Sequence, residues 1–279
     1  QAQVIPDFPE TAEEKILERA MPRLLGMDSP HWLTFLEKSF QNPAEPSDLP
    51  SLQQQYLRMW QFTLWGKDWQ EAGLKDSWEA IRLWQQTPEL CQEIQSILTL
   101  QFERFNVLPH KASLPYPCAL EVYCNYSRDQ IFAALGLNKP NSVREGVKYL
   151  HPGNSSLVNR DTDVFLVTLN KSEKEFSETT RYEDYSINDR LFHWQSQNAT
   201  TPESPTGQRY IKQQEKGNIV LLFVREQKKD AQGNSQNYTF LGTAQLSSWN
   251  GSQPITIIYH LDHPIPAKYI TTTDSSGVL

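Results

Sequence analysis

The sequence predicts an α+β protein, with an all-helical domain at residues 1–107 and a mostly antiparallel β-barrel or sandwich with one short helix at 108–279. Three observations predict this class. In the first part, apolar residues recur at the spacing of one helix face. Residues 108–117 contain three prolines and no helical period, which is typical of a domain boundary. In the second part, β-branched and aromatic runs follow one another without a helix after each strand.

The helical part begins with a capping box, in which Thr11 and Glu14 satisfy free N–H groups at a helix start. We expect Pro22 to kink this helix or end it before Gly26. Further helices are expected where cap residues precede an apolar stripe, at Ser29-Pro30, Ser51, Ser77 and Thr87-Pro88. Six of the eight tryptophans lie between Trp32 and Trp84, and their helical spacing predicts a packed core rather than a ligand cage.

The second part alternates short apolar runs with turn residues. A short helix is expected after the cap at Ser127, ending at Gly136. Strands are expected at 118–126, 147–150, 163–169, 218–225, 238–246 and 255–261. The runs at 163–169 and 218–225 have continuous β-branched and aromatic content, which predicts fully buried strands.

The negative charge is confined to the helical part. Residues 1–107 contain 9 Lys and Arg against 16 Asp and Glu, whereas residues 108–279 contain 17 of each. The overall charge of −7 therefore does not exclude nucleic acid as a partner of the second part.

Composition also bounds the compartment. Three irregularly spaced cysteines predict neither a disulfide framework nor a zinc site, and no apolar stretch approaches the ~18 residues of a membrane span. We expect a cytoplasmic protein with no cofactor and no membrane partner. The chain begins with Gln1 rather than Met, which is compatible with a piece of a longer protein.

The most unusual stretch is residues 181–210, R-Y-E-D-Y-S-I-N-D-R-L-F-H-W-Q-S-Q-N-A-T-T-P-E-S-P-T-G-Q-R-Y. From Phe192 to Gln197 it alternates like a strand, which places Phe, Trp and Ser on one face and His, Gln and Gln on the other. The loop expected at 198–207 contains two prolines and a glycine, which stiffen it. Stiff loops with amides, an arginine and aromatics are suited to base edges and phosphates.

Motifs of catalysis are absent from the sequence, which has no Walker loop, H-E-x-x-H or G-x-S-x-G. One enzymatic alternative stays open. Asp163 begins one buried strand and Glu226-x-Lys228 ends another, the residue types of a metal-dependent nuclease. Charged residues at the point where a strand ends in a turn also account for Glu226 and Lys228, without any catalytic role.

Several runs resemble a known family. They are D-V-F-L-V-T-L-N-K-S-E-K-E-F-S-E-T-T-R-Y-E-D-Y from residue 163, L-F-H-W-Q-S-Q-N from residue 191 and T-P-E-S-P-T-G-Q-R-Y-I from residue 201. They look like the uncharacterised domain that closes certain bacterial superfamily II helicases of the DEAD/DEAH restriction type. Residues 10–105 are similar to the acidic helical lead-in of that domain. The resemblance implies a C-terminal accessory region of a larger helicase used against foreign DNA. The motor motifs are absent, so no ATPase activity is implied.

We therefore predict a non-catalytic nucleic-acid recognition region, with DNA, including modified DNA, and the helicase motor as partners. Phosphate contacts are assigned to Lys171, Arg181, Arg209 and Lys228. Base-edge contacts are assigned to His193, Gln195, Gln197, Asn198 and Gln208, and base stacking to Trp194 or Tyr210. Tyr182 and Ser204 complete the predicted interface. The alternatives are the nuclease above and a structural or protein-docking module of the helicase.

Overall fold

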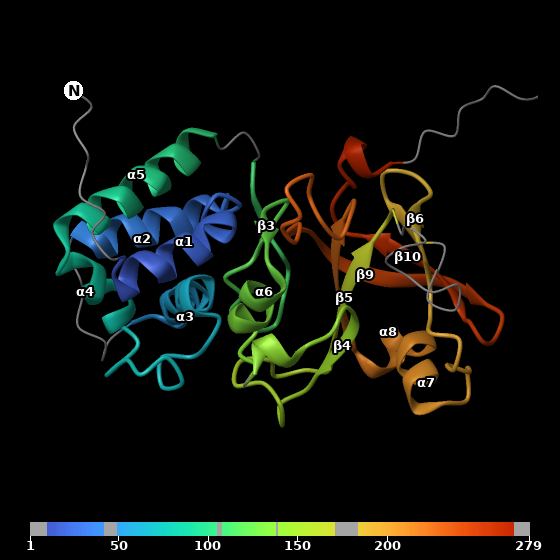
Figure 1. The fold of residues 1–279 in the computed structure, drawn as a ribbon. Helices are drawn as coiled ribbons and strands as arrows, with labels where there is room; N and C mark the ends of the chain where they lie inside the picture. The colour runs from blue at the N-terminus through green and yellow to red at the C-terminus, as the bar shows by residue number, and fades with distance from the viewer. Residues whose placement is uncertain (1–9, 42–48, 105–107, 138, 171–183, 271–279) are drawn as a thin grey trace, which may run out of the picture. The chain divides into compact units, whose positions relative to one another are not determined.

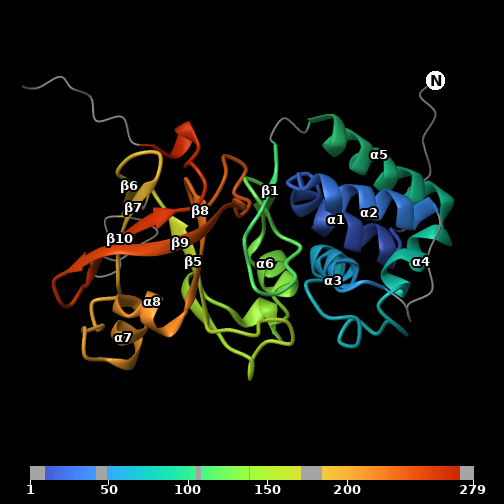
Figure 2. The same cartoon turned by 180° about the vertical axis from the view of Figure 1, so that it is seen from behind.

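The computed structural model describes residues 10–41, 49–104, 108–137, 139–170 and 184–270. By its internal contacts the chain divides into two compact units, residues 1–105 and 106–279 (Figure 1; Figure 2 from behind).

The first unit is helical, and its helices begin at or within two residues of the predicted starts, although the N-caps of α3 and α4 are Pro50 and Trp78. They are α1 (Ala12–Leu24), α2 (Pro30–Gln41), α3 (Ser51–Trp65), α4 (Glu79–Gln85) and α5 (Pro88–Arg104). The capping box of Thr11 and Glu14 is present. Pro22 lies inside the last turn of α1, and the helix ends two residues later at Leu24, before Gly26.

Tryptophans form the core of this unit, as predicted. Trp32, Trp60, Trp78 and Trp84 are at most 1% exposed. Two of them also satisfy their indole N–H groups, since Trp32 Nε1 donates to the carbonyl of Tyr56 at 3.0 Å and Trp60 Nε1 to that of Ala80 at 2.8 Å. Burial of such large side chains is what stabilises helices that would be marginal alone.

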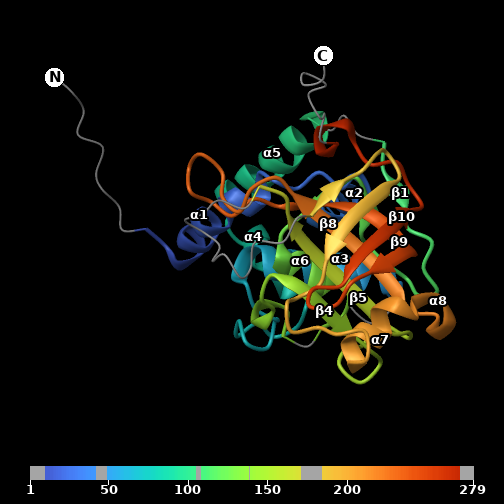
Figure 3. The same ribbon diagram turned by 90° about the vertical axis from the view of Figure 1, so that its right-hand side faces the viewer.

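The second unit is built on one large sheet. Its strands are β3 (Asn125–Tyr126), β4 (Gly146–Leu150), β5 (Thr162–Thr168), β6 (Tyr185–Ser186), β7 (Leu191–Gln195), β8 (Ile219–Arg225), β9 (Tyr238–Asn250) and β10 (Thr256–Leu261). The order is β4-β5-β8-β9-β10-β7-β6, with β3 paired to β9, and only β5 and β8 run parallel (Figure 3). The α+β class with a mostly antiparallel sheet is confirmed. Among the described strands the order is open, from β4 to β6, as in a sandwich rather than a closed barrel.

One face of this sheet covers an apolar core. Phe165, Phe192, Trp194 and Tyr259 meet there with Tyr210, which comes from outside the sheet. Both β5 and β8 are buried almost throughout, as their continuous apolar sequences predict.

Short elements differ from the prediction. The strand expected at 118–126 is two short pieces, β2 (Glu121–Val122), paired with β1 (His110–Lys111), and β3. Tyr123 adopts a positive φ of 77° between them, which interrupts the strand. α6 (Arg128–Ala134) is the predicted short helix, with a capping box at Ser127.

Two further helices, α7 (Pro205–Ile211) and α8 (Gln213–Lys216), begin within the loop expected at 198–207 and fill the segment before the strand expected at 218–225. They lie side by side and contact β9 (Figure 1). Ser204 caps α7 by accepting a hydrogen bond from the Gly207 N–H, and Pro205 occupies the first turn, where its missing N–H is harmless. The S-P pair is therefore a helix start rather than a loop.

Within the described part of the chain, no helix has the length and apolar character needed to cross a bilayer.

Candidate nucleic-acid interface

β7 has the two-faced character that its sequence predicts. Phe192, Trp194 and Ser196 are buried, whereas His193 and Gln195 are half-buried and Gln197 is exposed. The alternation is confirmed, because β7 covers the apolar core with one face and directs the other away from it.

The outward side chains of β7 continue across the neighbouring strands. Residues opposite one another in paired strands share a face, so the register defines rows. One row is Tyr185, His193, Ile258 and Ser248. The rows on either side of it are Gln195, Thr256 and Asn250, and Leu191, His260 and Gln245. We call these ten residues the outer face. Five of them are exposed and five are half-buried, and none is Asp, Glu, Lys or Arg.

A ring pair stands in the middle row of the outer face. The rings of Tyr185 and His193 are stacked, with centroids 4.5 Å apart and planes inclined by 16°. Tyr185 is 41% exposed. Tyr185 was missed in the sequence analysis. It begins the run Y-S-I, and the alternating burial of this run becomes visible only when Ser186 is known to pair with Phe192.

The polar residues of the S-P-T-G-Q-R-Y motif bond to the chain around α7. Ser204 caps α7, and Gln208 donates from Nε2 to the carbonyl of Pro202 at 2.7 Å. Gly207 lies so close to the preceding turn that an added Cβ would stand 1.9 Å from the Thr201 carbonyl oxygen. The motif thus packs α7 against its own lead-in.

Arg209 binds a buried carboxylate at the start of β5. Its Nε lies 3.0 and 2.8 Å from the two carboxylate oxygens of Asp163, which is fully buried, while the arginine side chain is 16% exposed. The guanidinium carbon lies 4.1 Å from the ring centroid of Tyr149, and Asn218 Nδ2 donates to Asp163 at 2.7 Å. We call Asp163, Arg209, Asn218 and Tyr149 the clamp.

Burial decides the electrostatics of the clamp. Loss of water raises the pKa of Asp163, and the hydrogen bond and charge of Arg209 oppose that rise, as does the bond from Asn218. In Arg209 the loss of water acts to lower the pKa, but the Asp163 carboxylate outweighs it and the pKa is raised. Each charge of the Asp163–Arg209 pair therefore stabilises the other, since either charge alone would be poorly solvated.

Three sequence-based assignments are corrected by these contacts. Trp194 is 6% exposed and Tyr210 is 5% exposed, and both belong to the apolar core, so neither presents a ring for base stacking. Arg209 was assigned to a phosphate, but its charge is paired with Asp163. The motif looked like a ligand loop because amides, arginine and tyrosine serve recognition and packing equally well.

The remaining predicted residues are scattered. Gln197 and Asn198 are exposed directly after β7, next to the outer face. Lys228 lies 3.9 Å from Glu145, beyond the end of β8. This end of β8 is far from the outer face. Val224 of β8 pairs with Thr239 of β9, and Ser248, which is in the row of His193, lies nine residues farther along β9, about 30 Å away. Lys171, Arg181 and Tyr182 lie outside the described residues.

Comparison with known families places the chain. The family described as "Domain of unknown function (DUF3427)" matches residues 120–272, more than half of the 279 residues. The chain belongs to the DUF3427 family. Comparison with curated proteins gives no match. Among solved structures, the crystal structure of Arabidopsis thaliana SUVH6 in complex with SAM aligns at 12% identity and a TM-score of 0.33, over 85% of this chain and 40% of that one.

In this DUF3427 chain the residues of the nuclease alternative lie at opposite ends of a strand pair. β5 and β8 run parallel, with Asp163 opposite Val220. Glu226 follows six residues after Val220, about 20 Å along the strand. Carboxylates of one metal centre must lie within a few ångströms of a shared ion, about 2.0–2.6 Å from each oxygen. Asp163 is moreover bound by Arg209. The trio therefore does not form one centre.

Proposed function

We propose that this DUF3427 chain is a non-catalytic nucleic-acid recognition region at the C-terminus of a bacterial superfamily II helicase, with DNA, including modified DNA, as its partner. The single observation that carries the proposal is the outer face, an exposed, uncharged sheet surface with a stacked Tyr185–His193 pair at its middle.

Such a surface suits unpaired bases. Every base has a flat face that stacks on an aromatic ring, and sheets that display aromatics bind single strands in this way. The amides of Gln195 and Asn250 lie one row away from the ring pair and can pair with base edges.

A cation stands near the edge of this face. Lys268 belongs to the 3-10 helix Ala267–Tyr269 and is exposed, with its Nζ 4.7 Å from the centroid of the Tyr269 ring. Ile270, two residues later, bridges to Ser186 of β6. Lys268 therefore takes the phosphate role that the sequence assigned to Arg209.

Binding of labelled oligonucleotides tests the proposal. Fluorescence anisotropy would compare single-stranded, duplex and base-modified duplex DNA at two ionic strengths. Loss of one stacked base weakens binding by about 1–3 kcal/mol, so Tyr185→Ala should weaken it roughly 5- to 150-fold. Lys268→Ala should flatten the dependence of log K on log salt by a little under one unit, about 0.7–0.9.

A matched aromatic serves as the control. Phe102 of α5 is 48% exposed, comparable to Tyr185, and lies in the helical unit. Phe102→Ala should leave binding unchanged. Equal binding by wild type and Tyr185→Ala would overturn the assignment of the outer face. No binding to any DNA at low salt would favour the alternative, a structural or docking module.

The link to a helicase rests on the sequence resemblance. It is tested by the reading frame that encodes the chain. A Walker motif upstream in the same frame would support the link, and a frame that opens at this chain would refute it.

A further inference from the structure

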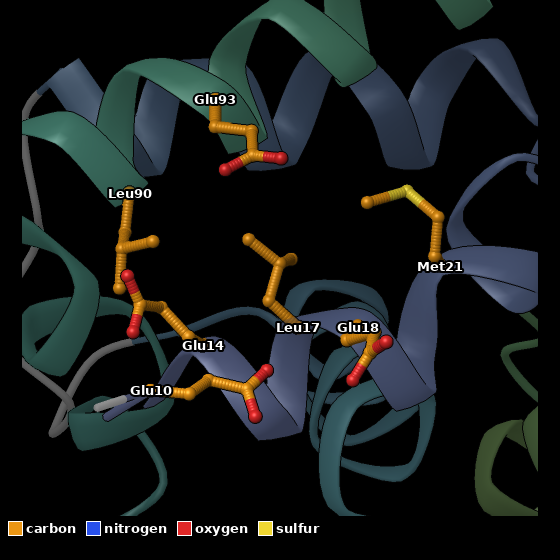
Figure 4. A pocket seen from close by; sticks show the side chains of 7 residues that line it. All are labelled: Glu10, Glu14, Leu17, Glu18, Met21, Leu90 and Glu93. Atoms are coloured by element: carbon orange, nitrogen blue, oxygen red, sulfur yellow. The ribbon is translucent and has the colours of Figure 1, made fainter. Parts of the chain in front are cut away.

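The helical unit contains a groove that the proposed function does not use. It lies between α1 and α5 and has a volume of about 440 Å³ (Figure 4). Figure 4 shows Leu17, Met21 and Glu93 directed into the space between the two helices. The groove is lined by Glu10, Glu14, Leu17, Glu18, Met21, Leu90 and Glu93.

The floor of the groove is apolar and is formed by Leu17, Met21 and Leu90. Gln101 follows Leu90 by eleven residues, three full turns of α5, so it lies on the same side of the helix. Its Nε2 donates to the carbonyls of Leu25 and Met27 at 2.7 and 2.8 Å, so α1 and α5 end side by side.

The rim of the groove carries one sign of charge. Its four glutamates are exposed, and no Lys or Arg is among the lining residues. Within the described residues, neither Glu18 nor Glu93 forms an ion pair. Hydrogen bonds from the backbone N–H and the side chain of Thr11 hold the pKa of Glu14 below its usual value, so this carboxylate stays charged.

We propose that this groove binds an amphipathic, basic helix of a protein partner. Its apolar side chains would lie against Leu17, Met21 and Leu90, and its Lys or Arg side chains would face Glu18 and Glu93. Apolar floors between helices accept helices through residues at i, i+3, i+4 and i+7. The charge of the rim repels nucleic acid and anionic lipid, which leaves a basic polypeptide as the complementary occupant.

The test uses the whole chain and a synthetic peptide of known character. The probe is a labelled leucine–lysine peptide of about 14 residues, ~20 Å as a helix, with leucines at i, i+3, i+4 and i+7. A scrambled peptide of the same composition has the same charge and no apolar face. Anisotropy should show the amphipathic peptide binding at least tenfold more tightly than the scrambled one.

Charge reversal locates the site. Glu18→Lys with Glu93→Lys should weaken binding of the amphipathic peptide at least tenfold. Glu37→Lys with Glu71→Lys reverses two exposed glutamates of the same unit outside the groove, so it changes the net charge equally and should weaken binding less than threefold. Met21→Gln removes apolar contact without changing charge and should weaken binding severalfold even if the reversed pair disturbs folding.

Two results would overturn the proposal. Equal binding of the amphipathic and scrambled peptides would show unspecific attraction to an acidic surface. Equal losses in the two double reversals, with Met21→Gln unchanged, would place the peptide elsewhere.

Discussion

Replacing Arg209 by methionine separates packing from charge in the clamp. Methionine keeps much of the apolar stem and removes the guanidinium that binds Asp163. Removing one partner of a buried ion pair destabilises a protein by about 3–5 kcal/mol, because the other charge stays buried. Asp163 is fully buried, but Arg209 is 16% exposed and the Asn218 bond survives the change. We therefore expect the lower end, about 3 kcal/mol, at neutral pH.

The pH dependence follows from the sign of the Asp163 shift. Its folded pKa lies above the usual 3.8, so its contribution to stability is complete below that value and declines as the pH rises through the raised one. In Arg209→Met the opposing positive charge is gone, and the pKa of Asp163 rises further. The free-energy difference between wild type and variant should therefore shrink as the pH falls toward 4.

Scanning calorimetry at several pH values checks both statements. A loss of about 3 kcal/mol corresponds to a fall of roughly 6–12 °C in the melting transition of the second unit. Asp163→Asn combined with Arg209→Met should recover much of the loss, because no buried charge is left. Arg128→Met is the control, since Arg128 is 37% exposed and pairs with its neighbour Asp129, and it should lose at most ~1 kcal/mol. An Arg209→Met protein as stable as this control, or a double variant worse than the single one, would refute the reasoning.

Three further outcomes are expected, two for substitutions in α7 and one for the alkylation of cysteine thiols. Gly207→Ala should destabilise the second unit by about 1–3 kcal/mol in urea unfolding, because the added Cβ meets the Thr201 carbonyl oxygen, while Thr206→Ala on the same helix should change little. Ser204→Ala removes the cap of α7 and should lose about 1 kcal/mol in the same assay; a neutral result would contradict the capping role. Burial raises the pKa of both thiols, that of Cys118 to about 11, which makes its reactive thiolate scarce at pH 8. Mass spectrometry after iodoacetamide should find Cys91 alkylated well before Cys118 in the native protein, and the reverse order would contradict that burial.

Local signals predicted most of the elements. The capping boxes at Thr11 and Ser127 mark helix starts because they satisfy backbone N–H groups within four residues of sequence. The continuous apolar runs of β5 and β8 predicted burial on both faces for the same local reason. α7 was missed because S-P-T-G contains residues that favour turns, although Ser204-Pro205 is the same cap-plus-proline start that predicted a helix at Ser29-Pro30.

The site was harder to predict, because its contacts are not local. The alternation of β7 correctly assigned His193 and Gln195 to the outward side, since a strand turns alternate residues apart. Nothing in the sequence connects Arg209 with Asp163, which lies 46 residues away. That pair follows from how α7 packs at the start of β5. Trp194 and Tyr210 were assigned to ligands although aromatic residues are more often core, and here they are.

The length of β9 has a mechanical consequence. This one strand pairs with β8 at Val220–Val224 and, farther along, with β10 at Thr256–Leu261. A pull along its axis would load many inter-strand hydrogen bonds at the same time, in shear, instead of breaking them one after another. If, as proposed, a helicase motor pulls on a nucleic-acid strand that is bound at Ser248, the hydrogen bonds between β8, β9 and β10 share the tension, and no single loop bears it.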